Sequence, residues 1–400
     1  MGVVDDLLAQ SYQRTQPSEK RQHRISIVVQ GVEIDGWEDY EIQSSMIQPA
    51  DAFTMRRRFE PAAWKALPRD SQVEVRIDGV TVLNGFIDKK KKRSKDNTIE
   101  VGGRDRSGRL VQESAPTVSV DGLEMTDAIK RLADPWFKTV TLSDARNRRL
   151  RLGKGRKVPT GTEPIVIRRT TRRAGKVHPG TARWSAIEEI VSQAGLICWS
   201  SADGRELVVG QPNYKQAPQF ELRLAKPSSG NTTTVKELDW EEDDGDRYSI
   251  IAVVGTGGDT EQDFGENVSS RRAVVRDNDG MLNAAADGTG RDFLYPKRLL
   301  MPEKNFDSNQ DALEIALREQ ARRDLRRTLV TATCDMHGQF AGLAAPTIFA
   351  PNTIARVIDE EFDPPVDQNF LIYQVTYRGN RNDGETSVLE LVPSETEIVL

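Results

Sequence analysis

The feature that most constrains the fold is a β-pattern that occurs twice in the chain. Residues 73–104 contain an alternating run, a turn, an apolar run, a polar loop and a last strand, and the same order returns in looser form at residues 354–392. Alternation of apolar and polar residues is typical of half-buried strands. The chain is therefore predicted to build one small β-unit twice. Two similar units per chain would let a three-fold assembly present six similar positions.

Composition narrows the class of protein. With 400 residues and 37% hydrophobic content, the chain can form two to four domains, each with its own core. A net charge of -5 argues against a dedicated nucleic-acid binder. The two cysteines, Cys198 and Cys334, form no metal-binding or redox motif and are expected to be buried thiols of a protein made in a reducing cytosol. No signal peptide and no membrane-spanning run is predicted.

The N-terminal part is predicted to be a short arm followed by β-structure. Residues 1–23 are polar and form the arm, and residues 24–115 form a first tube-like β-barrel. Strands are expected at residues 25–29, 40–44, 73–77, 80–87 and 98–103, with another beginning near Phe53. Lys89–Lys95 is expected to be a basic loop between the last two strands.

Residues 116–214 are predicted to form an α/β middle domain. Helical spacing of Ala128, Ile129, Leu132 and Ala133 ends at Asp134-Pro135. A second helix is expected at Trp184–Ala194, capped by Thr181 and followed by a hairpin at residues 196–209. A strongly basic insertion, residues 145–179, interrupts this domain.

Residues 215–400 are predicted to form a second tube-like β-barrel, with a helix at residues 308–327. Strands are expected at residues 232–238, 248–254, 330–335, 353–359, 370–377 and 387–392, and an acidic turn at residues 241–246. Residues 215–254 are alternatively assigned to the first barrel. The predicted class is α+β, mainly β: two tube-like antiparallel β-barrel domains with an α/β middle domain.

Searches for catalytic, cofactor and metal motifs give no candidate. The glycine spacing at Gly103–Gly108 lacks the Lys-Ser/Thr of a phosphate loop, and no helix-opening glycine pattern follows Gly255. The acidic residues 239–246 lack the glycine and the last carboxylate of a calcium loop. His23, His178 and His337 are too few and too scattered for most acid-base or metal schemes. No cofactor is expected. A carboxylate pair for sugar hydrolysis stays open, because such a pair is assembled in space and leaves no fixed spacing in the sequence.

Basic residues are the remaining candidates for a functional surface. They could contact DNA phosphates, form a solvated hairpin tip, or form an inter-subunit salt-bridge surface facing the acidic loops. The candidate interface or phosphate-contact residues are Lys89, Lys90, Lys91, Lys92, Arg93, Arg168, Arg169, Arg172 and Arg173.

The ordered set of motifs resembles the baseplate hub family of contractile-tailed phages such as Mu, also called the late control gene D family. The resemblance covers nearly the whole chain from residue 24. The residues that carry it are Gly36-Trp37, Phe53, Asn84–Asp88, Gly103-Arg104 with Gly108 and Leu110, Trp184–Leu196, Asp203-Gly204, Arg247–Ser249 with Val253 and Gly255, Leu371–Tyr377 and Ser387–Pro393. The basic insertion at 145–179 is longer than the family pattern, so its role does not carry over.

The resemblance implies a structural protein of the phage tail without enzymatic activity. The expected assembly is a trimeric ring in the virion baseplate that joins the six-fold tail tube to the three-fold spike and lets DNA pass during ejection. The partners would be two further copies of the chain, the spike protein, and the tube or tube-adjacent baseplate proteins. Two alternatives stay open at this point, a tail-tip cell-wall hydrolase and a DNA-binding tail protein.

Overall fold

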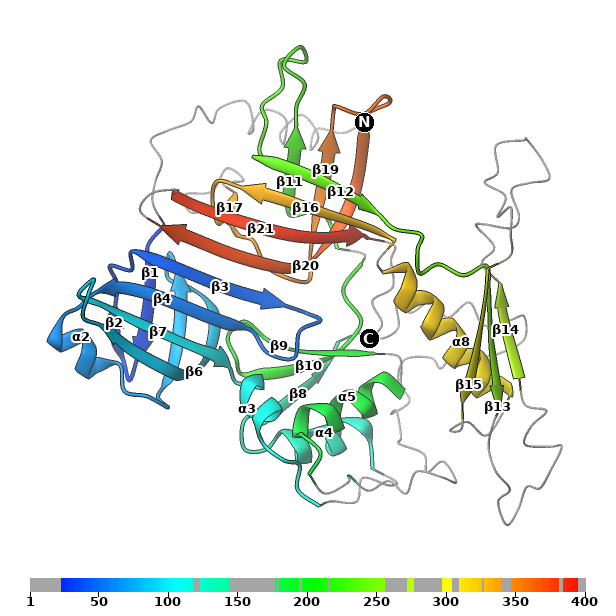
Figure 1. Ribbon diagram of the computed structural model, residues 1–400, viewed down its shortest axis with the longest axis horizontal. Coiled ribbons are helices and arrows are strands. Elements are labelled where there is room, and N and C mark those ends of the chain that lie inside the picture. The colour runs from blue at the N-terminus through cyan, green and yellow to red at the C-terminus, as the bar shows by residue number, and fades with distance from the viewer. Residues whose placement is uncertain are drawn as a thin grey trace.

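The computed structural model describes residues 23–117, 123–143, 177, 180–193, 196–214, 216–255, 272–276, 297–303, 309–325, 327–339, 347–380 and 384–394. The fold is mainly β, and a single 13-stranded sheet runs through both parts of the predicted repeat. Figure 1 shows this sheet with a small α/β unit below it and a second α/β unit to its right. In the described ranges the sheet does not close into a barrel, so the two predicted barrels are two halves of one open sheet.

The N-terminal half of the sheet follows the alternation in the sequence. In β5 the apolar residues Val73, Val75 and Ile77 are buried and the polar residues between them are not. Positive backbone φ angles at Asp78 and Gly79 make the tight turn into the next strand. The elements of this half are β1 (Ile25–Val29), β2 (Val32–Ile34), β3 (Asp39–Ser45), β4 (Ala52–Arg58), α2 (Pro61–Ala66), β5 (Gln72–Ile77), β6 (Val80–Arg93) and β7 (Thr98–Asp105).

The C-terminal half repeats this pattern with a long last hairpin. Ten residue pairs join the two strands of the hairpin, from Phe370 opposite Pro393 to Asn380 opposite Gly384. A short two-stranded sheet, β17 (Gly338–Gln339) with β18 (Thr347–Ile348), lies beside it. The large-sheet strands of this half are β11 (Phe220–Leu224), β12 (Glu237–Glu242), β16 (Thr328–Cys334), β19 (Thr353–Asp359), β20 (Val366–Asn380) and β21 (Gly384–Pro393).

The strand order makes the internal repeat explicit. One half of the sheet runs β12-β16-β21-β20 and the other runs β3-β4-β7-β6, and the halves join where β20 pairs antiparallel with β3. The first part of β6 pairs antiparallel with β5, and the first part of β20 pairs antiparallel with β19. The halves therefore correspond strand by strand. The correspondence ends at the next strand, because β1 pairs antiparallel with β5 whereas β11 pairs parallel with β19.

Two matching β-bulges fix the register of the halves. The pairing of β6 with β7 shifts by one residue between Ile87 and Lys89. The pairing of β20 with β21 shifts in the same way between Ile372 and Gln374. Both strands are long, and the bulge shifts by one residue which side chains of each strand face its neighbour.

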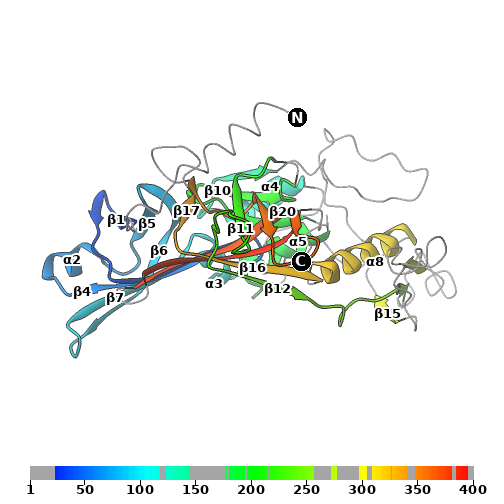
Figure 2. The same cartoon turned by 90° about the horizontal axis from the view of Figure 1, so that it is seen from above.

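The main core lies on one face of this sheet. Figure 2 shows the sheet edge-on as a curved band, with β1, β5, β11 and β17 all on one side of it. Phe53, Met55, Phe370 and Tyr377 point into this core and are at most 2% exposed. Each fully buried side chain of this size stabilises the fold by about 1.5–3 kcal/mol.

A separate α/β unit forms from residues 107–210. Its sheet has the order β8-β10-β9, and Ile187 and Leu132 on the helices pack against Leu207 and Val209 in one buried cluster. The Asp134-Pro135 peptide ends α4, as the sequence predicts. The elements are α3 (Ser107–Gln112), α4 (Met125–Ala133), β8 (Thr139–Leu142), α5 (Arg183–Gln193), β9 (Ile197–Ser200) and β10 (Glu206–Gly210).

A third unit was not expected from the sequence. The strands β13 (Ile250–Gly255), β14 (Arg272–Arg276) and β15 (Arg298–Glu303) form a sheet of their own. Helix α8 (Asn309–Asp324) packs on that sheet through Ala312 and Ala316, not on the large sheet. The small side chains of the two alanines let the helix lie close to the strands.

Two local expectations are corrected. Residues 89–93 are not a loop, because β6 continues to Arg93 and pairs with β7 throughout. The predicted strand at 232–238 begins later, at Glu237, and includes the first two residues of the expected acidic turn, ending at Glu242. In both places runs of charged residues hid a strand whose outward face is solvated.

Candidate assembly surface

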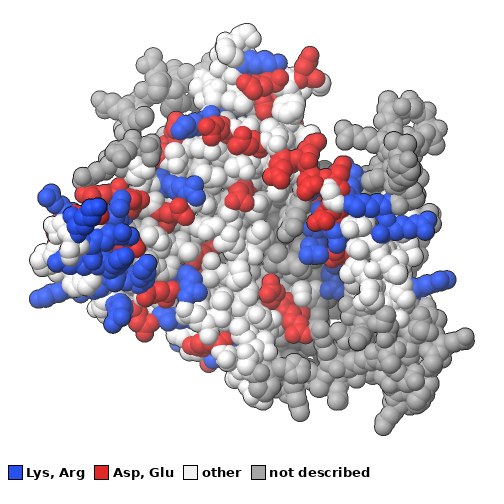
Figure 3. All heavy atoms as spheres, viewed as in Figure 1, with Lys and Arg blue, Asp and Glu red and all other residues white. Residues whose placement is uncertain are grey.

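The face of the large sheet opposite the core is exposed and polar. Figure 3 views this face, where Lys and Arg gather over β4, β6 and β7 on one side and Asp and Glu lie along β12 on the other. The outward residues alternate with the core residues along each strand. Across the sheet they include Glu237, Asp239, Glu241, Thr331, Thr333, Arg378, Asp39, Glu41, Thr54, Arg56, Arg58, Glu100, Lys89, Lys91 and Arg93.

Cross-strand ion pairs neutralise the middle of this face. Arg56 Nη2 lies 2.5 Å from Asp39 Oδ2, and Arg378 Nε lies 3.0 Å from Glu41 Oε2. These residues sit directly opposite each other in the strand register. Opposite charges in such positions stabilise the pairing of strands, and each pair cancels one positive charge against one negative charge.

One end of the sheet is a basic edge, defined here as Lys89–Arg93 of β6. After the bulge these residues pair with β7, while the pairing of β6 with β5 ends at Phe86. Within the described ranges, the other side of Lys89–Arg93 therefore carries no partner strand. Glu100 of β7 accepts a hydrogen bond of 2.9 Å from Arg93 Nε, and its pKa is lowered mainly by this bond.

The lysines of the basic edge point to both faces of the sheet. Lys90 and Lys92 turn toward α2, where their ammonium groups lie 4.0 Å from the Trp64 ring centroid and 3.9 Å from the Phe59 ring centroid. Lys90 also donates to the Trp64 carbonyl at 2.9 Å, and partial burial lowers its pKa. Lys89 and Lys91 lie on the exposed face. The sequence could not show that alternate lysines cap the aromatic end of the core, and the role of these residues as interface or phosphate contacts stays a prediction.

The other end of the sheet is an acidic edge, defined here as Asp239–Asp243. Asp239 and Glu241 are exposed, whereas Leu238 and Trp240, which alternate with them along the strand, face the core. The strand β12 pairs with β16, and no second strand pairs with it among the described residues. Among the residues that the structure describes, no salt bridge involves Asp239, Glu241 or Lys91.

The remaining predicted site residues lie outside the described residues. These are Arg168, Arg169, Arg172 and Arg173 of the basic insertion. Their role as interface or phosphate-contact residues stays a prediction.

Two histidines that seemed scattered in the sequence meet in the structure. The rings of His23 and His337 stack with centroids 4.9 Å apart. His23 Nε2 accepts a hydrogen bond of 3.1 Å from the His337 backbone N–H, so the neutral ring carries its proton on Nδ1, 2.6 Å from Asp78 Oδ2. No signal in the sequence pairs positions 314 residues apart.

The second histidine completes a buried polar network. His337 Nε2 lies 2.6 Å from the Tyr40 hydroxyl, which donates to Glu385, and Nδ1 lies 2.8 Å from the Ser387 hydroxyl. Burial, and secondarily the neighbouring His23, lower the pKa of His337 to about 3. A serine beside a histidine resembles a nucleophile and its base. Both Ser387 and His337 are 0% exposed, so no substrate reaches them and the network joins strands instead.

Two buried carboxyl groups lie where the large sheet meets the middle unit. Burial raises the pKa of Asp51 to about 7, against hydrogen bonds from Ser45 N–H and the Ser44 hydroxyl. Burial and the charge of Asp51 raise the pKa of Asp105 well above its usual value. The two groups are each 7% exposed or less, which again excludes access by a substrate.

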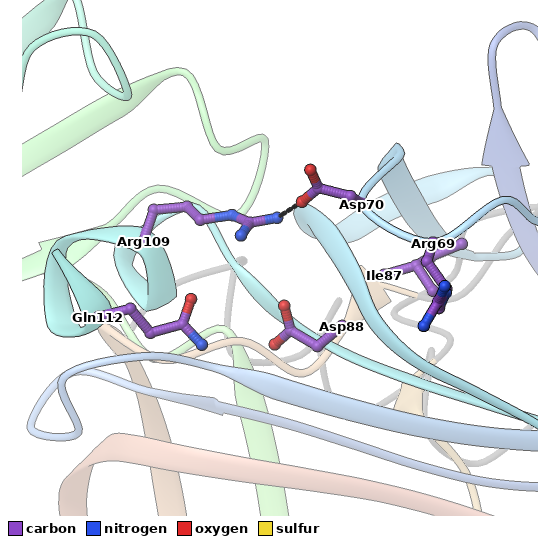
Figure 4. A pocket seen from close by; sticks show the side chains of 6 residues that line it. All are labelled: Arg69, Asp70, Ile87, Asp88, Arg109 and Gln112. Atoms are coloured by element: carbon purple, nitrogen blue, oxygen red, sulfur yellow. Dashed lines mark hydrogen bonds and ion pairs between the residues drawn. The ribbon is translucent and has the colours of Figure 1, made fainter.

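A shallow pocket of about 680 Å³ lies beside the β6 bulge. Figure 4 shows Arg109 reaching Asp70 across it, with Gln112, Asp88, Ile87 and Arg69 around the wall. The charged groups are engaged in structural contacts: Asp88 pairs with Arg104 at 3.0 Å, and the Arg109 guanidinium stacks on Phe86 at 4.5 Å. The pocket therefore offers no isolated acid, base or nucleophile.

Within the described ranges, no group of three or more His, Cys, Asp or Glu side chains could hold a metal ion. Cys198 and Cys334 are buried and free. None of the helices that the structure describes is both long and apolar enough to cross a membrane.

Comparisons with known proteins bear on the fold and on its first part. Residues 24–105 match the family model "Mu phage baseplate assembly protein GpP-like, N-terminal". The whole fold is similar to a tail protein from Neisseria meningitidis MC58, with 24% identity, a TM-score of 0.71, and coverage of 93% of this chain and 96% of that one. The chain has the fold of a phage tail protein.

Two further solved structures are similar. The 43 kDa tail protein of prophage MuSo2 from Shewanella oneidensis has 16% identity and a TM-score of 0.68, with coverage of 94% of this chain and 100% of that one. The E. coli c3393 protein, a component of the type VI secretion system, has 11% identity and a TM-score of 0.51, with coverage of 92% and 76%. No curated protein sequence matches the chain. These likenesses concern the fold, and the family model concerns residues 24–105.

Proposed function

We propose that the chain is the baseplate hub of a phage tail. Three copies form a ring that joins the six-fold tail tube to the three-fold spike, and the ring stays open for DNA during ejection. The observation that carries the proposal is the division of the exposed sheet into two corresponding four-stranded halves, β3-β4-β7-β6 and β12-β16-β21-β20. Three chains would contribute six such halves, so the ring would have three-fold symmetry in its chains and approximate six-fold symmetry in its sheet halves.

The match of residues 24–105 to a Mu-type baseplate model supports this role for the first half. The similarity of the whole fold to solved tail proteins supports it for the rest. The partners follow from the position of a hub: further copies of the chain, the spike, and the tube or its adjacent baseplate proteins. The protein would be made in the host cytoplasm and reside in the virion baseplate.

The passage of DNA fits the charge on the exposed sheet face. The opposite face is covered by the chain's own core, so the exposed face is the one available to line a channel. Its cations in the middle of the sheet, Arg56 and Arg378, are held by carboxylates on neighbouring strands. A lining of this kind gives few unpaired charges for phosphates to bind, which suits transit rather than retention.

The test is the mass and shape of the purified full-length protein. Light scattering across a concentration series is expected to show a species of three times the 44.7 kDa chain mass. Electron microscopy of that species is expected to show a three-fold ring with a central opening. A strict monomer, alone and with the spike protein added, would contradict the proposal.

A further inference from the structure

The two edges of the exposed sheet carry opposite charge and lie at its opposite ends. We propose that the basic edge, Lys89–Arg93, of one copy pairs antiparallel with the acidic edge, Asp239–Asp243, of a second copy. The register is the one that β20 and β3 use inside the chain. The inference rests on the proposed function, because it names the partner surfaces that close the ring.

The correspondence of β6 with β20 follows from the bulges. The shift after Ile87 in β6 matches the shift after Ile372 in β20, so Lys89 corresponds to Gln374. Counting along both strands, Lys91 corresponds to Thr376 and Arg93 to Arg378. The part of β20 that corresponds to the basic edge is the part that pairs with β3.

The correspondence of β12 with β3 follows from the register across each half. In the first half Lys90 lies opposite Val101, Val101 opposite Met55, and Met55 opposite Tyr40. In the second half the same path starts at Val375, the residue that corresponds to Lys90. It runs through Leu389 and Ala332 to Leu238. Tyr40 therefore corresponds to Leu238, and both are buried.

The register inside the chain can now be transferred to two copies. Within the chain, β20 places Gln374, Thr376 and Arg378 opposite Ser45, Gln43 and Glu41. The corresponding residues between copies are Lys89 opposite Asp243, Lys91 opposite Glu241, and Arg93 opposite Asp239. All three pairs join opposite charges. The pair Arg93 with Asp239 is the counterpart of Arg378 with Glu41, whose atoms lie 3.0 Å apart.

Strand direction agrees with this pairing. Every neighbouring pair from β12 to β6 is antiparallel, and seven such steps leave β6 antiparallel to β12. A second copy placed in line with the first would thus meet it with strands of the correct direction. Charges are complementary at three successive outward positions, which favours a second copy of the chain as the partner of the basic edge. DNA could bind the basic edge but would make no use of the acidic edge.

The register can be tested by cross-linking full-length protein. Directly opposite residues of an antiparallel pair have Cα atoms about 4.5–5.5 Å apart, within the range that a disulfide spans. The variant Lys91→Cys with Glu241→Cys is expected to form covalent dimers and trimers on oxidation. The control Lys89→Cys with Asp239→Cys is displaced by four residues, about 13 Å, and is expected to stay uncross-linked. The native cysteines are buried and do not interfere.

Charge reversal tests the same contact without cysteines. Lys91→Glu is expected to raise the protein concentration needed for half assembly by about tenfold, since it places two like charges opposite each other. Adding Glu241→Lys is expected to restore assembly. Lys138→Glu, an exposed reversal in the middle unit, is the matched control and is expected to leave assembly unchanged.

The outcomes separate the inference from the proposed function. Rings that form normally while Lys91→Cys with Glu241→Cys fails to cross-link would overturn the edge pairing and leave the hub role standing. Equal cross-linking of the displaced control would overturn the register. Loss of DNA retention in Lys91→Glu with unchanged assembly would assign the basic edge to DNA instead. A chain that neither associates nor cross-links at any concentration would count against both proposals.

Discussion

Replacing His337 with glutamine is expected to make the protein less sensitive to acid. The imidazole of His337 is fully buried, accepts or donates at both ring nitrogens, and has its pKa lowered from 6.5 to about 3. A histidine with a lowered pKa in the folded state favours folding when it is neutral. Its stabilisation is fully present above pH 6.5 and is lost as the pH falls from there toward 3.

The size of the effect follows from the shift in pKa. At pH 5 this imidazole is protonated in the unfolded chain but still neutral in the folded chain. The pH then lies 1.5 units below the unfolded pKa of 6.5, and this difference sets the free energy that favours unfolding. At about 1.36 kcal/mol per unit, the wild type loses about 2 kcal/mol between pH 7.5 and pH 5 through His337. Asp51 acts in the opposite direction, because its pKa is raised to about 7 and protonation favours the folded state. Only the difference between wild type and variant isolates the histidine.

The measurement is urea unfolding at pH 7.5 and at pH 5. Unfolding is followed by hydrogen exchange of peptides from β3, β16 and β21, the strands next to the network. The glutamine variant is expected to be less stable than wild type at pH 7.5, because the hydrogen bonds to Tyr40 and Ser387 are disturbed. Its loss of stability on acidification is expected to be about 2 kcal/mol smaller than that of the wild type. Equal losses in the two proteins would refute the assignment of acid sensitivity to His337.

Three further outcomes are expected. Gly103→Ala should prevent stable folding, measured by thermal unfolding, because the added methyl would overlap a carbonyl oxygen of β6. Asp51→Asn should remove the contribution of Asp51 to the pH dependence, so that from about pH 4 to about pH 7 the variant gains stability relative to the wild type in urea unfolding, since the raised pKa of this carboxyl favours the folded state only while it is protonated. Asp39→Asn with Glu41→Gln should release two arginines from ion pairs and strengthen binding of duplex DNA, with a salt slope steeper by about 1.8 in fluorescence anisotropy, while Asp203→Asn should not. An unchanged salt slope in the double variant would contradict the charge balance described for the sheet face.

Much of the fold could be predicted from the sequence because regularly spaced apolar residues mark the strands. The strand β5 is buried on one side only, and its bounds, like those of β1 and β19, lie close to the predicted ones. Alternation failed where charge dominated. In Lys89–Arg93 every position is basic, so nothing in the sequence distinguishes the residues that cap Trp64 and Phe59 from those on the exposed face.

The candidate site was harder to predict, because it depends on register and topology rather than on local sequence. The basic residues Lys89–Arg93 were predicted as interface candidates, but their acidic counterpart was expected to be a turn. Recognising Asp239 and Glu241 required the strand order and the two bulges. The meeting of His23 with His337 depends on the joining of the two halves, which no single segment encodes.

The junction between β20 and β3 has a consequence for how a ring of this design would assemble. Because one chain contains both strands, that junction forms at a local concentration set by the chain and needs no encounter between molecules. Six separate halves would each lose translational and rotational freedom on joining, at about 4–15 kcal/mol for every association. Three chains need only two such associations where six pieces need five. The duplication thus moves the greater part of the entropic cost of closure from assembly into folding, and leaves three seams at which subunits can be added or exchanged.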